Sequence, residues 1–129
     1  MRNIVSSFLY LRAIWQILAF EYYVVRKDFA SLYWKVRDYP RSSVRPSLNL
    51  TDQICKAVDV VCIWHLKQVL CLQRSAATTC LLKRYGVSAQ MVIGAQQTPF
   101  KAHAWVEVGG RVVNDKPYMT EIYAVLDRC

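Results

Sequence analysis

One cysteine and one histidine stand at positions from which they could carry out nucleophilic catalysis. Cys71 lies in a stretch without Gly or Pro that ends at Gly86, and a helix break near Leu70, which local signals do not settle, would place it in the first turn of a helix. The positive end of the helix dipole favours the thiolate there, which is the nucleophilic form. Such a cysteine needs a base within hydrogen-bond reach, and the base needs a third group to hold its tautomer. His103, at the start of an expected strand, is the candidate base because a strand aims the ring rigidly.

The third group would come from the far side of a β-hairpin that turns near Gly109 and Gly110. A two-residue loop would send His103 and Asp115 to opposite faces, because side chains alternate along a strand. A three-residue loop from Val108 to Gly110, with Gly110 at positive φ, shifts the register by one residue. In that register His103 lies directly opposite Asp115.

Charge and packing favour the three-residue loop. Glu107 then faces Arg111 and Trp105 faces Val113, and each such pair contributes from a few tenths to about one kcal/mol. The opposite face would consist of residues that suit a core: Ala104, Val106 and Val112.

The sequence therefore predicts a catalytic triad of Cys71, His103 and Asp115. Two alternatives stay open. His103 and Asp115 could form a cross-strand polar pair without a catalytic role, or the acid could be Glu107 or Asp127.

The other histidine and the remaining cysteines favour structural roles. His65 is expected in the middle of a helix, where a core or surface position is favoured over catalysis. Zinc binding is the competing interpretation for a group of four residues close in sequence: Cys62, His65, Cys71 and Cys80. No C-x2-C pair accompanies them, so we predict no metal and no cofactor. The odd count of five cysteines favours free thiols and a reducing compartment such as the cytoplasm.

The elements that must position these residues form an α+β pattern. Residues 3–37 are expected to be helical and residues 38–50 to form a linker. From Thr51, the expected N-cap, to Tyr85 the pattern is helical, and mean helix length favours two helices over one. Short strands are expected at residues 89–95, 103–108, 111–114 and 122–126, with loops at 96–102 and 116–120. The 129 residues fit a single domain, with residues 1–48 as an N-terminal helical segment and 49–129 as the core.

The first helical region carries an apolar stripe with alternating steps of four and three: Ile4, Phe8, Leu11, Trp15, Leu18 and Tyr22. Packing of this stripe on the rest of the domain is favoured, and docking on a partner or a membrane surface is the alternative. Arg12 interrupts the apolar run, so we predict no transmembrane segment. The net charge of +8 indicates an acidic partner or a solubilising bias, and no motif supports nucleic-acid binding.

With these residues in view, four segments resemble a known family: Cys71-Leu72, Arg84-Tyr85-Gly86-Val87, Val92-Ile93-Gly94 and PFKAHAWVEVGGRVVND at residues 99–115. The chain is similar, over about residues 50–129, to the lasso-peptide biosynthesis B2 proteins and to the C-terminal domain of unsplit B proteins. The resemblance implies a transglutaminase/papain-like core with Cys71 as nucleophile, His103 as base and Asp115 as orienting acid. It also implies a leader peptidase in antimicrobial peptide biosynthesis.

The implied substrate is the leader region of a ribosomally made precursor, cut before a macrolactam cyclase acts. A recognition protein, B1, would deliver the leader. The resemblance assigns no functional residue to 1–48.

For the oxyanion we expect the backbone N–H of Cys71 as the donor, with Gln68 or Trp64 as side-chain candidates. An acyltransferase and a non-catalytic leader-binding scaffold stay open as alternatives.

Overall fold

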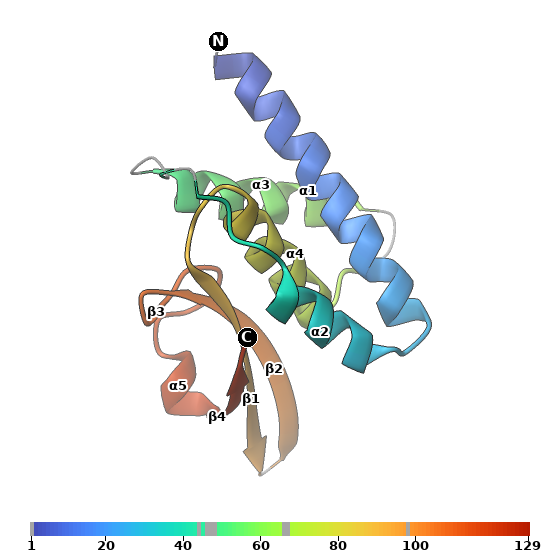
Figure 1. The fold of residues 1–129 in the computed structure, drawn as a ribbon. Helices are drawn as coiled ribbons and strands as arrows, with labels where there is room; N and C mark the ends of the chain where they lie inside the picture. The colour runs from blue at the N-terminus through green and yellow to red at the C-terminus, as the bar shows by residue number, and fades with distance from the viewer. Residues whose placement is uncertain (1, 44, 46–48, 66–67, 98) are drawn as a thin grey trace.

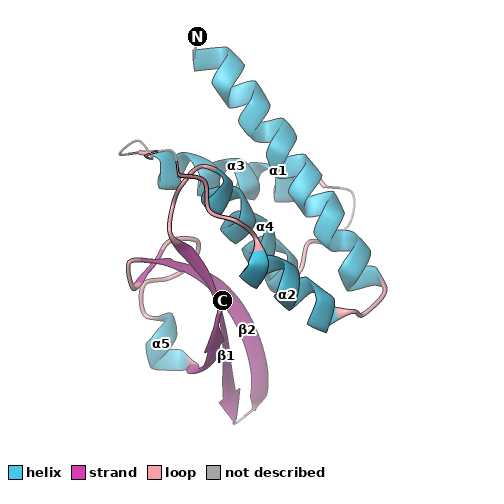
Figure 2. Ribbon diagram, in the orientation of Figure 1, coloured by secondary structure: helices cyan, strands magenta, loops and turns pink. Residues whose placement is uncertain are grey.

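The computed structural model describes the backbone of residues 2–43, 45, 49–65, 68–97 and 99–129, with side chains from Phe8 onwards within these ranges. The elements in chain order are α1 (Arg2–Val25), α2 (Phe29–Asp38), α3 (Leu50–Trp64), α4 (Cys71–Arg84), β1 (Ala89–Gln97), β2 (Phe100–Val108), β3 (Arg111–Val112), α5 (Met119–Ile122) and β4 (Ala124–Arg128) (Figure 1). The strands form an antiparallel sheet in the order β3-β2-β1-β4. Helices α1 to α4 gather at one side of it and α5 at the other (Figure 2). The predicted α+β class is confirmed.

The long helical stretch of the second region is divided into α3 and α4, as mean helix length favoured. The chain leaves the helical conformation at His65 and returns to it at Cys71, with Leu70 in extended conformation as the N-cap. Asn49 takes the N-cap position of α3 without a side-chain hydrogen bond, so the prediction of Thr51 as the cap is wrong. His65 lies just after the end of α3 and not in the middle of a helix.

Helix α4 ends as the sequence predicts. Gly86 has a φ of 89°, and it follows the C-cap Tyr85. The amide of Val87 donates to the carbonyl of Leu82 at 2.9 Å, and the amide of Gly86 to that of Lys83 at 3.0 Å. These bonds form a Schellman motif, which needs a residue at positive φ after the helix and therefore favours glycine.

The first helical region is broken into α1 and α2 at a turn that the sequence pattern does not reveal. Lys27 in this turn has a φ of 55°, and the carboxylate of Asp28 accepts a hydrogen bond from the amide of Ser31 at 3.3 Å. Asp28 thus caps α2 at its N-terminus, which is a frequent role of aspartate. The turn lets α2 fold back beside α1 and pack on α4.

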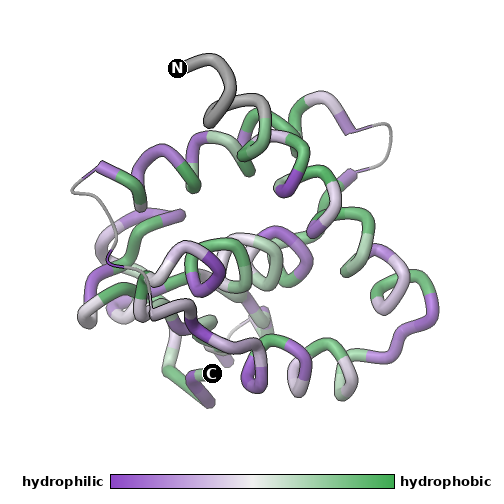
Figure 3. The backbone as a smooth tube through the Cα atoms, turned by 45° about the horizontal axis from the view of Figure 1, so that its top comes forward, coloured by the Kyte–Doolittle hydropathy of each residue, from purple (hydrophilic) through white to green (hydrophobic). Residues whose placement is uncertain are grey.

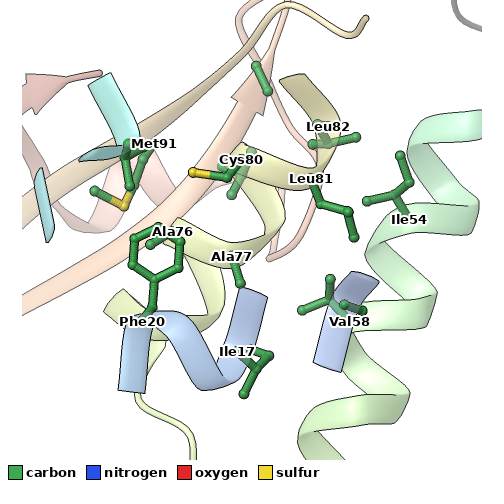
Figure 4. Packing of buried hydrophobic residues seen from close by; sticks show 14 of the residues in the cluster. Ile17, Phe20, Ile54, Val58, Ala76, Ala77, Cys80, Leu81, Leu82 and Met91 are labelled. Atoms are coloured by element: carbon green, nitrogen blue, oxygen red, sulfur yellow. The ribbon is translucent and has the colours of Figure 1, made fainter. Parts of the chain in front are cut away.

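The core forms around α4, which packs against α1, α2, α3, β1 and β2. Figure 4 shows the buried side chains that meet there: Ile17, Phe20, Ile54, Val58, Ala76, Ala77, Cys80, Leu81, Leu82 and Met91. Hydrophobic and hydrophilic residues alternate along the chain (Figure 3). Helices α2 and α3 bury one side each, whereas the central α4 is buried on most of its surface. This core fixes α4 within the domain. Cys71 is the first residue of that helix.

Helix α1 buries a different face from the predicted one. Its buried residues are Leu9, Ala13, Gln16, Ile17 and Phe20. The residues of the predicted stripe are exposed: Phe8, Leu11, Trp15, Leu18 and Tyr22, while the side chain of Ile4 lies outside the described residues. The prediction that this stripe packs on the rest of the domain is therefore wrong. Small Ala13 on the buried face allows the close approach of helices that a stripe of large side chains does not.

The hairpin between β2 and β3 has the two-residue loop. Val108 pairs with Arg111 and Glu107 pairs with Val112, so the predicted register is wrong. Gly109 and Gly110 have φ values of 59° and 78°, so both adopt the left-handed conformation of a type I′ turn.

Gly110 was expected at positive φ, and Gly109 was not. A Gly-Gly pair enters the type I′ turn without steric cost, and the twist of this turn matches the twist of the strands. These effects outweigh the cross-strand ion pair that the longer loop would have offered.

The other face of the sheet carries a second small cluster. Its buried residues are Val92, Trp105 and Met119, and Val112 packs against them. Val112 thus shares the face of Trp105 and not, as expected, that of Ala104. Met119 comes from α5, which occupies part of the stretch 116–120 that was expected to be a loop.

Candidate active site

His103 and Asp115 are in direct contact. The Nε2 atom of His103 lies 2.7 Å from Oδ2 of Asp115, and both side chains are mostly buried. The predicted contact is confirmed, although the hairpin register from which it was inferred is wrong. Strict alternation from the observed loop would separate the two side chains, so a local feature of the chain must bring Asp115 back.

That feature is Asn114, which ends the ladder between β2 and β3. The amide of Val113 still donates to the carbonyl of Val106 at 3.0 Å. The amide of Val106 then donates at 2.7 Å to the side-chain Oδ1 of Asn114, in place of a backbone carbonyl. Because a side chain completes the ladder, the backbone bends away after Val112 and the alternation is broken. Asp115 is thereby turned toward His103.

Asn114 also connects this bend to the first turns of α4. Its Nδ2 donates to Oγ of Ser75 at 3.3 Å, and Ser75 donates to the carbonyl of Ala104 at 3.0 Å. Arg74 donates to the carbonyl of Asn114 at 3.2 Å. Arg74 and Ser75 lie one turn after Cys71, so these bonds fix the start of α4 beside the strand that carries His103. The sequence alone does not single out Asn114 or Ser75, since an asparagine or serine beside a strand has many ordinary roles.

Asp115 is held as a carboxylate by its surroundings. Burial raises the pKa of Asp115, but the hydrogen bond with His103 and the one from the amide of Lys116, at 2.8 Å, lower it, and the net shift is downward. The guanidinium of Arg74, 4.0 Å from Oδ2, acts in the same direction. A carboxylate accepts hydrogen bonds only, so Nε2 of His103 is the protonated nitrogen and Nδ1 is free to act as a base.

Aromatic side chains fix the plane of the His103 ring. The ring stacks on Tyr123 with centroids 5.4 Å apart and on Trp105 at 6.2 Å. The indole Nε1 of Trp105 donates to the buried carboxylate of Glu107 at 2.9 Å. Rings held in this way lose little further freedom when a reaction requires the imidazole in one orientation.

Gly94 makes room for this aromatic group. It pairs with His103 across β1 and β2. A Cβ atom at this position would lie 2.6 Å from Cη2 of Trp105 and 2.9 Å from Cβ of Tyr123. The glycine inside a strand was a signal of close approach that the sequence offered. Tyr123 offered none, because its contact with His103 depends on the sheet order.

Cys71 lies at the first position of α4, half-buried at the wall of an open cleft of about 570 Å³. The cleft is lined by Asp59, Cys62, Ile63, Gln68, Val69, Cys71 and Arg74. Gln68, one oxyanion candidate, shares this cleft, whereas Trp64 lines a separate pocket with α1. The first backbone N–H groups of a helix have no partner within it, so the amide of Cys71 is suited to bind an oxyanion.

The other candidate residues lie in structural contacts. His65 binds Glu21 of α1, with Nε2 and Oε1 3.2 Å apart. Glu107 is bound by Trp105 and Arg128, and Asp127 by the hydroxyl of Tyr33. Among the described residues, no three His, Cys, Asp or Glu side chains are grouped to hold a metal ion, so the zinc interpretation gains no support.

The five cysteines differ in their surroundings, which predicts a selective alkylation. Burial raises the pKa of Cys55 and Cys80 to about 12 and of Cys129 to about 11, and it also raises that of Cys62. At pH 8 a thiol with a pKa near 12 is ionised to about one part in 10⁴. Limiting iodoacetamide at pH 8 should therefore modify Cys71 first, as peptide mapping by mass spectrometry would show.

Two controls sharpen this labelling experiment. Raising the pH increases the thiolate fraction of each suppressed thiol about tenfold per unit, so labelling of the other four cysteines should rise with pH. A Cys71→Ser variant should lose the rapid phase altogether. Equal labelling of all five thiols in the folded protein would contradict the assignment of Cys71.

Comparison with known proteins identifies the superfamily to which this chain belongs. The family model of the transglutaminase-like superfamily matches residues 15–128. The chain is also similar to the microcin J25-processing protein McjB of Escherichia coli, with 39% identity over 83 residues. These residues are 62% of this chain and 40% of McjB, so the chain spans less than half of that relative's length. No solved structure matches. The match over nearly the whole chain shows that this protein belongs to the transglutaminase-like superfamily.

Proposed function

We propose that this protein is a cysteine endopeptidase that removes the leader peptide from a lasso-peptide precursor. The observation that carries the proposal is the His103–Asp115 hydrogen bond, held beside the start of the helix that presents Cys71. Nucleophile, base and orienting acid are the parts that acyl transfer by a cysteine requires. The superfamily and the similarity to a microcin-processing protein favour a peptide bond as the target.

In the proposed reaction, Nδ1 of His103 accepts the proton of the Cys71 thiol, and the sulfur attacks the scissile carbonyl carbon. The amide of Cys71 donates to the resulting oxyanion. The C–N bond breaks as His103 returns the proton to the leaving amine, which leaves the leader as a thioester on Cys71. Water, deprotonated by His103, then attacks the thioester carbon; the C–S bond breaks, the leader leaves with a new carboxyl group, and His103 returns the proton to the sulfur of Cys71. Asp115 stabilises the imidazolium at each proton transfer.

The substrate and the partners follow from the resemblance to B2 proteins. The chain would cut the leader of a ribosomally made precursor, and the freed amine would be the group that a macrolactam cyclase joins. A separate B1 protein would recognise the leader and deliver it. The five free cysteines fit the bacterial cytoplasm as the compartment.

Hydrolysis can be separated from acyl transfer by the fate of the thioester. Cleavage of a cognate precursor in heavy-oxygen water should place one labelled oxygen in the new carboxylate of the leader, because water resolves the intermediate. Mass spectrometry of the released leader measures it, with and without the B1 protein. A leader joined to an added amine and free of label would instead assign an acyltransferase.

A non-catalytic scaffold is the alternative from another class. It would bind the leader without cutting it, so no labelled leader carboxylate would form in heavy-oxygen water. The filled His103–Asp115 pair favours the enzyme over the scaffold, since a binding protein needs no oriented base.

A further inference from the structure

A continuous apolar surface lies along α1, away from the proposed site. Between Phe8 and Val25 every exposed side chain is aliphatic or aromatic: Phe8, Leu11, Ile14, Trp15, Leu18, Tyr22 and Val25. The two charged residues of this stretch face the rest of the protein. Arg12 donates to the hydroxyl of Tyr85 at 2.8 Å, and Glu21 binds His65. An uncharged helix face of this length marks an interaction surface.

The spacing of the exposed side chains indicates which kind of partner structure packs against them. Six of them alternate in steps of three and four, which is an average of 3.5 residues: Phe8, Leu11, Trp15, Leu18, Tyr22 and Val25. We refer to these six residues as the α1 seam. A repeat of 3.5 is the period of a coiled coil, in which the side chains of one helix fit between those of another.

We propose that a second copy of this chain covers the α1 seam, with the two helices antiparallel about a two-fold axis between Trp15 and Leu18. Trp15 then faces the partner's Leu18, Leu11 faces the partner's Tyr22, and Phe8 faces the partner's Val25. In this register every aromatic side chain meets an aliphatic one. Large residues opposite small ones fill the space between two helices evenly, and the contact is the same from both copies.

The exposed area of the α1 seam is sufficient for a weak dimer. Aromatic side chains offer about 150–250 Å² each, and Phe8, Trp15 and Tyr22 are 55%, 70% and 56% exposed. With the aliphatic residues, each copy buries on the order of 600 Å², and two copies reach the lower limit of stable interfaces, about 1,200 Å². A dissociation constant on the order of micromolar is expected.

A membrane is the competing occupant. Residues 8–25 are apolar and long enough to cross one by length and composition alone, so the absence of a transmembrane segment stays a prediction. A helix that lies on a membrane carries a broad apolar face bordered by cationic residues. Here the seam is narrow, Arg12 is engaged by Tyr85, and Arg26, which borders the seam, is engaged by Tyr22. These features favour a helix as the occupant.

Sedimentation of the full chain between about 1 and 100 µM tests the proposal. The average mass should rise with concentration toward that of two chains, and Trp15→Glu should weaken the association at least about tenfold. The matched control is Trp34→Glu, because Trp34 is an exposed tryptophan of α2 outside the α1 seam. A wild-type protein that stays monomeric throughout overturns the proposal, and so does a dimer that Trp15→Glu leaves unchanged.

The register is tested by mixing two variants. Trp15→Glu and Leu18→Lys should each dimerise poorly alone. In a mixture, one pair of facing positions becomes Glu against Lys and the other stays Trp against Leu, so a heterodimer should form. No recovery on mixing overturns the antiparallel register. The dimer is also overturned if the wild-type protein is monomeric and floats with vesicles that contain anionic lipid, while Trp15→Glu does not float. That result would assign the surface to a membrane.

Discussion

The Cys71→Ala variant should lose leader cleavage, with a fall in kcat of at least about 10³-fold. The thiol is the nucleophile of the proposed reaction, and the remaining groups cannot form the thioester. His103→Ala should be about as damaging, because the members of a triad act as a unit. Folding should be retained, since Cys71 is only half-buried at the first turn of α4. Cleavage of a cognate precursor followed by mass spectrometry measures the effect.

The neighbouring thiol provides the control for this experiment. Cys62 lines the same cleft, and burial raises its pKa. Cys62→Ala should therefore keep most of the cleavage activity, and circular dichroism should show the same helix content for both alanine variants. Cleavage that persists in Cys71→Ala would show that another group is the nucleophile.

Local signals in the sequence were sufficient for the parts of the fold that rest on local chemistry. The end of α4 depends on one glycine at positive φ, and Gly86 stands where it is needed. The limited length of helices favours a division of the stretch from Thr51 to Tyr85, but no local signal places the break before Cys71. The end of α4 could thus be predicted from local signals, and its start at Cys71 could not.

The face of α1 could not be predicted in the same way. Both sides of this helix are apolar, and the stripe with the regular spacing is the exposed one. Which side is buried depends on how α1 packs against α3 and α4, and the face with Leu9, Ala13 and Ile17 is the one that packs. A pattern of apolar residues identifies a helix but does not rank two apolar faces.

The hairpin shows a different limit, since a correct contact was inferred from an incorrect register. The ion pair of the longer loop predicts the wrong register because the preference of Gly-Gly for a type I′ turn outweighs it. His103 and Asp115 meet because Asn114 replaces a backbone acceptor and bends the chain. A side chain that substitutes for the backbone leaves no periodic signal in a sequence.

This role of Asn114 leads to the second large expected effect. Asn114→Ala leaves the amide of Val106 without its acceptor, which costs about 1–3 kcal/mol, and it frees the backbone to continue the regular ladder. Continued alternation would turn Asp115 away from His103. We expect kcat to fall by about 10²-fold, because the base loses the group that holds its tautomer, while KM changes little.

An NMR signal from His103 shows whether Asn114 acts through Asp115, because a loss of stability alone would not remove this signal from the folded protein. The Nε2 proton of His103 should give a downfield NMR signal in the wild type, through its bond to Asp115, and this signal should vanish in Asn114→Ala. Ser75→Ala is the matched control, since it removes one bond to Asn114 but leaves the 2.7 Å bond to Val106 in place. It should keep the NMR signal and most of kcat. An Asn114→Ala protein that is folded at the assay temperature and retains full kcat would show that the bend at Asp115 forms without this side chain.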